Sequence, residues 1–211
     1  MMCTKGAEMI GDKRILWTDS PDRQRGRAAA LPAVSLWGEE GAAIAAEACL
    51  EMLGFAVERV RSDMTEAQAH AAIRSTDITL VFSGTRLAAS GDRDFSAIAQ
   101  AAYGLGRALA TKTGFHAVVL RAALPPGTAE GVVAPIIAEL SGKTEAEDFG
   151  MAVHAAPLDD MLVPEDVFCL PAAGIGVDCP DARRLLVQLM APVHCSLPFT
   201  SVSRAERASW H

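Results

Sequence analysis

The sequence predicts a three-layer α/β fold, in which helices cover both faces of a mostly parallel sheet. Short β-branched runs, typical of buried strands, alternate with stretches whose apolar residues recur at helical spacing. The clearest unit spans residues 116–150, where a strand at 117–120 leads through a Pro-Pro-Gly turn into a helix opened by Thr128. The composition agrees, since 50% of the residues are apolar and 21% are charged, a balance typical of folded chains.

The first part of the chain predicts a strand–turn–helix–strand unit. Residues 1–32 are interpreted as an N-terminal extension, because the polar stretch at 19–27 favours a loop or an exposed arm. We then expect a strand at 33–37, a helix at 42–53, a strand at 55–60 and a short helix at 65–74. This is the context that a dinucleotide-binding turn requires.

The rest of the chain continues the alternation of strands and helices on both sides of the 116–150 unit. Before it we expect a buried strand at 77–83 and a helix that Asp94 caps and that ends at about residue 111. After it we expect strands at 151–154, 167–170 and 193–196, a helix at 181–190, and the start of another helix at 201–210.

Charge and cysteine usage exclude several classes of protein. The net charge of −7 argues against a nucleic-acid surface, and no apolar run approaches the length of a membrane span. The N-terminus lacks the apolar core of a signal peptide. The five cysteines are scattered, and neither they nor the histidines stand in metal-binding spacing. We therefore expect reduced thiols, no metal and a cytoplasmic protein.

The 116–150 stretch also resembles a segment of the UDP-glucose/GDP-mannose 6-dehydrogenase family, with the GDP-mannose branch nearer because it too has Ser-Gly-Lys and Asp-Phe-Gly here. The resemblance extends weakly to residue 210 and implies a Rossmann-like dehydrogenase N-terminal domain at 33–200, followed at 201–211 by the start of a truncated helix. The residues in register are Arg121, Pro126, Gly127, Thr128, Val132, Val133, Pro135, Ile137, Ser141, Gly142, Lys143, Asp148, Phe149 and Gly150.

The resemblance also implies a cofactor site, with NAD and NADP both open. Gly38 takes the place of the family's first glycine, whereas Glu40 replaces the second, where a carboxylate would oppose the pyrophosphate. If the turn is aligned so that Gly41 rather than Glu40 takes the second glycine position, this repulsion would be avoided. Ala43 replaces the third glycine. Arg61 replaces the acid that holds the ribose hydroxyls, and it is either a partner for a 2′-phosphate or a solvated arginine at the strand end.

Two further cofactor contacts are implied beyond the next strand. Ser83 and Thr85 resemble the family's Val-Gly-Thr-Pro segment, whose threonine lies beside the cofactor. Thr85 therefore either touches a nucleotide or bonds its own backbone.

The catalytic positions are substituted. By resemblance, the catalytic threonine is Ala123, the glutamate is Ala156 and the lysine is Ser209. The nucleophilic cysteine would lie in a second domain. Cys169 stands in a similar Phe-Cys-Leu-Pro sequence, but its apolar context favours a buried structural thiol. No catalytic residue is therefore assigned.

Three functions stay open. The first is an inactive relative that serves as a binding, regulatory or scaffolding protein in a nucleotide-sugar or exopolysaccharide pathway. The second is an NAD(P)-dependent oxidoreductase of this family that is active only with a partner chain supplying the cysteine domain. The third is an interaction module without a small ligand. A protein partner or a homo-oligomer is expected, with a nucleotide or nucleotide sugar as a candidate ligand.

Overall fold

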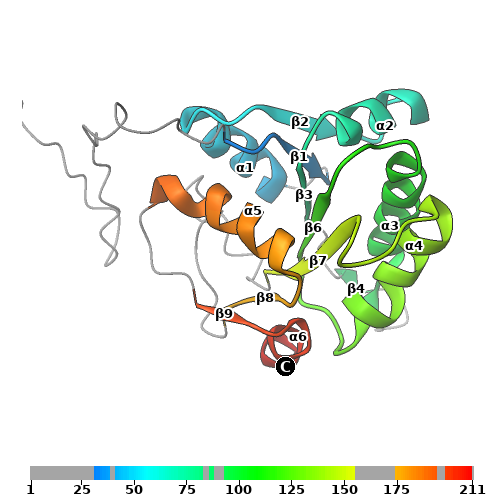
Figure 1. Ribbon diagram of the computed structural model, residues 1–211, viewed down its shortest axis with the longest axis vertical. Helices are drawn as coiled ribbons and strands as arrows, with labels where there is room; N and C mark the ends of the chain where they lie inside the picture. The colour runs from blue at the N-terminus through cyan, green and yellow to red at the C-terminus, as the bar shows by residue number, and fades with distance from the viewer. Residues whose placement is uncertain are drawn as a thin grey trace, which may run out of the picture.

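The computed structural model describes residues 31–38, 41–82, 86–87, 93–154, 174–193 and 198–210. These residues form a seven-stranded sheet in the order β2-β1-β3-β6-β7-β8-β9 and a separate pair, β4-β5 (Figure 1). The strands are β1 (Val34–Trp37), β2 (Val57–Val60), β3 (Ile78–Phe82), β4 (Arg86–Leu87), β5 (Arg93–Asp94), β6 (His116–Arg121), β7 (Phe149–Val153), β8 (Ile175–Val177) and β9 (Phe199–Thr200).

Neighbouring strands of the large sheet are parallel except at β7 and β8, which are antiparallel. In Figure 1, α1 and α5 cover one face of the sheet, and α2, α3 and α4 cover the other. This confirms the predicted three-layer α/β fold with a mostly parallel sheet. The helices are α1 (Gly41–Met52), α2 (Glu66–Arg74), α3 (Ser96–Leu109), the π-helical turn η2 (Ala129–Val133), α4 (Ala134–Ser141), α5 (Pro180–Met190), the 3₁₀ turn η4 (Ala191–Val193) and α6 (Val202–Ser209).

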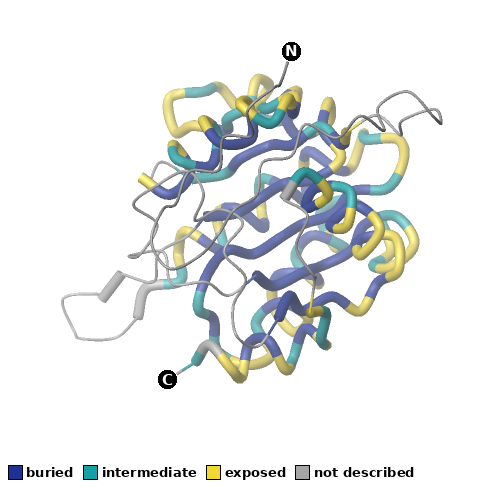
Figure 2. The backbone as a smooth tube through the Cα atoms, turned by 90° about the vertical axis from the view of Figure 1, so that its left-hand side faces the viewer, coloured by how far each residue is buried: buried dark blue, intermediate teal, exposed yellow. Residues whose placement is uncertain are grey.

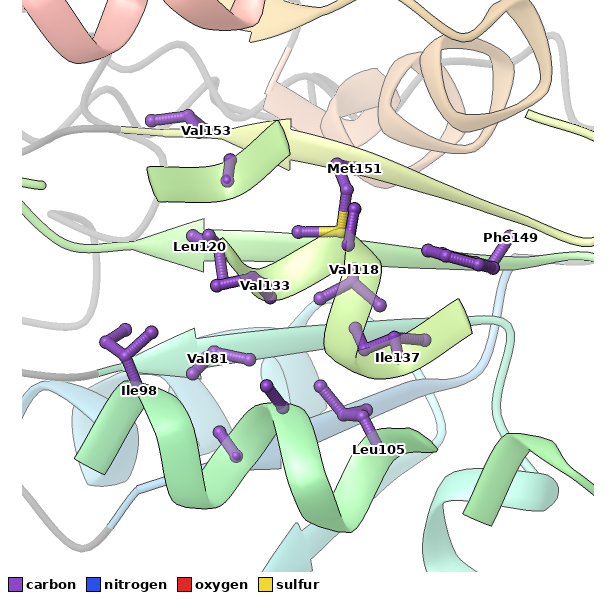
Figure 3. Close-up of a cluster of buried hydrophobic side chains, with 14 of the residues drawn as sticks. Val81, Ile98, Leu105, Val118, Leu120, Val133, Ile137, Phe149, Met151 and Val153 are labelled. Carbon is purple, nitrogen blue, oxygen red and sulfur yellow. The ribbon is translucent and has the colours of Figure 1, made fainter. Parts of the chain in front are cut away.

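The central strands are buried on both faces. Every residue of β3, β6 and β7 is buried, and these strands run as a dark band through the middle of Figure 2. Figure 3 shows one of the two core clusters, in which Val81, Val118 and Met151 of the sheet lie against Leu105 of α3 and Ile137 of α4. Apolar residues on both sides of a strand require helices on both sides, which explains the layered architecture.

One local prediction was wrong, and another lies mostly outside the described ranges. The N-cap position of α3 is Phe95, which makes no side-chain capping bond, and not the predicted Asp94, which lies in β5 opposite Arg86. The strand predicted at 193–196 is tested only at its first residue, Val193, which ends the 3₁₀ turn η4. Among the described residues after η4, the next strand is β9, from Phe199 to Thr200. Residues 194–197 and the strand predicted at 167–170 lie outside the described ranges.

A chain of buried polar groups joins β1, β3 and β6 at their amino-terminal ends. Nδ1 of His116 lies 3.1 Å from the carbonyl oxygen of Thr76, and Nε2 lies 2.8 Å from Oγ1 of Thr79. Because a carbonyl can only accept, Nδ1 carries the proton and Nε2 accepts from Thr79. Oγ1 of Thr79 lies 2.6 Å from Oγ of Ser35, to which Thr76 Oγ1 donates at 3.0 Å. With the imidazole neutral, both ring nitrogens of His116 have a hydrogen-bond partner.

The C-terminal helix is attached to the rest of the fold by a buried carboxylate. Oε2 of Glu206 accepts from the backbone N–H of Gly127 at 2.5 Å, and Oε1 accepts from that of Ala129 at 2.7 Å. The side chain is fully buried. These donors belong to the turn after β6 and the first turn of η2, where backbone N–H groups favour an anion. Glu206 thereby joins α6 to a segment almost eighty positions earlier in the chain.

The His116 network predicts loss of stability in acid. Burial, with the charge of Lys112 second, lowers the pKa of His116 to about 3. Between that value and the unfolded pKa of about 6.5, the unfolded chain binds one more proton at this residue, so stability falls as pH falls. We expect a slope approaching about 1.4 kcal/mol per pH unit from this group.

Urea unfolding of the wild type and of His116→Gln at pH values between neutrality and this range measures that slope. The variant should be less stable at neutral pH but should lose less stability on acidification. His70→Gln on α2 is the control, and should keep the wild-type response because His116 is still present. Equal acid slopes for the wild type and His116→Gln would contradict this assignment.

Glu206 predicts a second stability effect. In Glu206→Gln an amide NH₂ would face one of the two backbone N–H donors, so that one buried donor loses its acceptor. The expected cost is about 1–3 kcal/mol in the free energy of unfolding, measured by urea denaturation. Glu139→Gln, on the exposed side of α4, should stay within about 0.5 kcal/mol of the wild type. An equally small change for Glu206→Gln would show that the carboxylate does not hold α6.

Candidate functional site

The carboxyl ends of β1, β3, β6 and β7 meet at one edge of the sheet. Their registers align Trp37 with Val81, Phe82 with Arg121, and Leu120 with Val153. In open α/β sheets, ligands bind in the crevice beyond these ends. The segments that follow the strands are therefore where a site is expected.

The turn after β1 needs glycine at its first position. Gly38 has φ +134°, and a Cβ there would lie 2.5 Å from the carbonyl oxygen of Phe82, at the end of β3. A side chain would therefore clash with the neighbouring strand. Gly41 begins α1, and no atom lies within 4 Å of where its Cβ would be. Gly38 at the end of β1 and Gly41 at the start of α1 thus have backbone without side chains on either side of residues 39–40, and a helix N-terminus of this kind favours an anion.

Ala43 packs inward from this helix. It is fully buried in the core cluster between α1 and the sheet, where its methyl group fits without opening the packing. Gly38, Gly41 and Ala43 thus lie at the junction of β1 and α1, whereas residues 39–40 lie outside the described ranges.

Arg61 follows the last residue of β2, the strand next to β1. Its Nε donates to Oδ1 of Asp63 at 2.9 Å, and Nη2 lies 3.4 Å from Oδ2. Both side chains are exposed, at 49% and 70%. This hydrogen bond raises the pKa of Arg61 and lowers that of Asp63. The guanidinium is thus charged, accessible and oriented to bind an oxyanion with two donors.

Ala123 lies just beyond β6 at the same edge and is partly exposed. The predicted positions Ser83, Thr85 and Ala156 lie outside the described ranges. Ser209 is the last residue of α6, and its side chain is not described.

Sequence reasoning missed a buried cation at the carboxyl ends of β6 and β7. Nη1 of Arg121 contacts Nδ1 of His154 and lies 3.0 Å from its Nε2, and both residues are buried. The guanidinium carbon lies 5.7 Å from the ring centroid of Phe82. An arginine at the end of the apolar run from 117 to 120 was the available signal. The contact with His154 depends on the β6–β7 pairing, which a local pattern does not reveal.

Other chemistries find little support in the described part of the chain. No cluster of histidine, cysteine, aspartate or glutamate there could hold a metal ion. Cys49 and Cys179 are buried thiols, and Cys169 lies outside the described ranges. Among the described helices, none is long and apolar enough to cross a bilayer.

Comparisons with known proteins agree with this geometry. The GDP-mannose 6-dehydrogenase of Azotobacter vinelandii is 35% identical over 126 residues, covering 58% of this chain and 29% of the relative. The UDP-glucose 6-dehydrogenase AglM of Haloferax volcanii is 29% identical over 144 residues, covering 65% of this chain and 32% of that protein. The chain therefore spans about a third of the length of these relatives.

Two solved structures share the fold. A ternary complex of GDP-mannose dehydrogenase from Pseudomonas aeruginosa matches with a TM-score of 0.72 at 23% identity, covering 83% of this chain and 48% of that one. A UDP-glucose dehydrogenase from Pyrobaculum islandicum also gives 0.72, at 24% identity, covering 86% and 49%. The family model for the NAD binding domain matches residues 35–194, which are most of the sequence. This chain therefore belongs to the UDP-glucose/GDP-mannose dehydrogenase family, whose NAD binding domain it contains.

Proposed function

We propose that this chain is a catalytically inactive member of its family that keeps the dinucleotide-binding scaffold and acts as a binding or regulatory domain in nucleotide-sugar metabolism. The observation that supports this most directly is Ala123. It lies directly beyond β6, at the carboxyl edge of the sheet, where the family resemblance places a catalytic threonine. A methyl group can neither donate nor accept a hydrogen bond, so it cannot orient a water or a substrate oxygen.

The other two positions reinforce the proposal. By the same resemblance, Ala156 replaces a glutamate and Ser209 replaces a lysine. A glutamate can move a proton and a lysine can stabilise an oxyanion, whereas alanine can do neither and serine has no positive charge. Losing one general acid or base costs roughly 10²–10⁴-fold in rate. The three substitutions together remove the groups that would move protons and stabilise charge during oxidation of an alcohol.

Of the positions that would hold a dinucleotide, Gly38 is retained and Ala43 is a small replacement. Gly38 and Gly41 present backbone at the start of α1, and Ala43 lets that helix pack closely on the sheet. Arg61 directly follows β2, where folds of this kind hold the ribose. NAD, when bound, would supply a hydride acceptor. Glu40 adds a carboxylate to the sequence just before α1, so we expect weaker binding than in a member with glycine there.

The role that fits these features is to bind a nucleotide without catalysing a reaction. A domain that can hold a nucleotide but lacks proton-transfer groups could change its interactions with a protein partner or a second copy when the ligand binds. We place this role in a pathway that handles nucleotide sugars for an exopolysaccharide.

The proposal predicts no dehydrogenase activity. The purified chain, given NAD or NADP with GDP-mannose or UDP-glucose, should produce no reduced nicotinamide detectable by ultraviolet absorbance. The Azotobacter vinelandii GDP-mannose 6-dehydrogenase serves as the positive assay control. Ala123→Thr should also be silent, because one restored hydroxyl does not replace the missing glutamate and lysine.

Formation of reduced nicotinamide in proportion to the amount of wild-type chain would contradict the proposal. A signal that arises only after addition of a separate protein with a catalytic cysteine domain would instead support a two-chain oxidoreductase. Both outcomes concern turnover and are independent of how tightly a nucleotide binds.

A further inference from the structure

Arg61 lies where a dinucleotide-binding fold distinguishes its two cofactor forms. β2 pairs with β1 in parallel, with Val60 opposite Trp37, so Arg61 and Gly38 follow directly at the same edge of the sheet. In such folds the pyrophosphate lies at the turn after the first strand, and the adenosine ribose lies at the end of the second. Arg61 therefore follows β2 at the position where the ribose of a bound dinucleotide is expected.

The alternation of β2 directs Arg61 toward that crevice. Arg59 donates to Glu47 of α1 at 3.2 Å, whereas Val60 packs into the core on the opposite face of the sheet. Side chains two residues apart share a face, so Arg61 continues on the side covered by α1.

The guanidinium already binds an oxyanion in this position. Nε and Nη2 of Arg61 face both carboxylate oxygens of Asp63, as they would face two phosphate oxygens. Because both partners are exposed, the pair is screened by solvent and can be displaced by a stronger acceptor. A carboxylate at the position of Arg61 would instead accept hydrogen bonds from the ribose hydroxyls, which an arginine cannot do.

We propose that Arg61 makes this site selective for nucleotides that bear a phosphate on the adenosine 2′ oxygen, so that NADP binds in preference to NAD. The inference rests on the proposed function in one respect, which is that the scaffold binds a dinucleotide. It does not depend on whether the chain catalyses a reaction. It also does not depend on Glu40, because the selectivity arises at the adenosine end, away from the pyrophosphate turn.

Calorimetry on the full chain with adenosine fragments tests this directly. Adenosine 2′,5′-bisphosphate should bind about tenfold or more tightly than adenosine 5′-phosphate, as expected for an added charge-assisted contact. Adenosine 3′,5′-bisphosphate, which has the same number of phosphates, should bind less tightly than the 2′,5′ isomer. NADP should exceed NAD by a similar factor.

Variants identify the residue responsible. Arg61→Ala should abolish the preference for the 2′-phosphate, and Arg61→Lys should keep part of it because the charge remains but the fork does not. Asp63→Asn removes the competing carboxylate and should tighten binding of the 2′,5′ fragment. Arg184→Ala, which breaks a similarly exposed Arg–Asp pair on α5, is the matched control and should leave the preference unchanged.

Equal affinities for the two adenosine fragments would overturn the inference, as would tighter binding of the fragment without the 2′-phosphate or no binding of either. A preference that survives in Arg61→Ala would also overturn it. The proposed inactivity is measured separately by the absorbance assay, so that a chain with turnover but a preference for NADP would refute only the proposed function.

Discussion

Burial of the central strands on both faces is the constraint on which the rest of the structure depends. β3, β6 and β7 expose no residue to solvent, so apolar helices must cover each side of the sheet. Helical connections between neighbouring strands make those strands parallel. Parallel strands place all their carboxyl ends at one edge of the sheet. For that reason Gly38, Arg61 and Ala123, which follow β1, β2 and β6, all lie at that edge. The location of the candidate site thus follows from the packing of the core.

The buried polar groups then specify how the parts align. His116 and the hydroxyls around it connect β1, β3 and β6 at the amino edge, and Arg121 with His154 connects β6 and β7 at the opposite edge. Glu206 fixes the C-terminal helix against the turn after β6. Apolar packing alone tolerates small shifts in register. A buried donor or acceptor that is left without a partner instead lowers the free energy of unfolding by about 1–3 kcal/mol. These contacts therefore favour a single alignment of the strands.

The sequence predicted the elements whose signal is local. The strands β1, β3 and β6 appear as short apolar runs, and Thr65 caps α2 with a reciprocal bond to Gln68 at the predicted helix start. The errors have longer-range causes. Asp94 resembles a cap, but the pairing of β4 with β5 places it in a strand. The short antiparallel strand β8 was not predicted, because three residues give too little pattern.

The site was predicted to a similar extent. The positions of Gly38, Gly41 and Ala43 follow from a motif within one turn, which a linear pattern can locate. The pairing of Arg61 with Asp63 and the contact of Arg121 with His154 depend on side-chain direction and on strand neighbours. The carboxylate of Glu206 bonds backbone groups far away in the sequence, and neither end of that contact has a local signature. Resemblance aligned these residues with a family, but only the structure gave their partners.

A fold of this kind can persist after its chemistry is lost, because different residues support the two. Gly38 lies so close to Phe82 that a side chain would not fit there, and small buried residues such as Ala43 line the inner face of α1. Ala123 lies beyond the end of β6, where removal of a hydroxyl leaves both core clusters intact. Substitutions at such loop positions cost little stability, whereas a side chain at Gly38 would force apart two parallel strands. Selection on stability alone would therefore retain the glycine turn while allowing the proton-transfer groups to be replaced, and the retained turn is by itself no sign of catalysis.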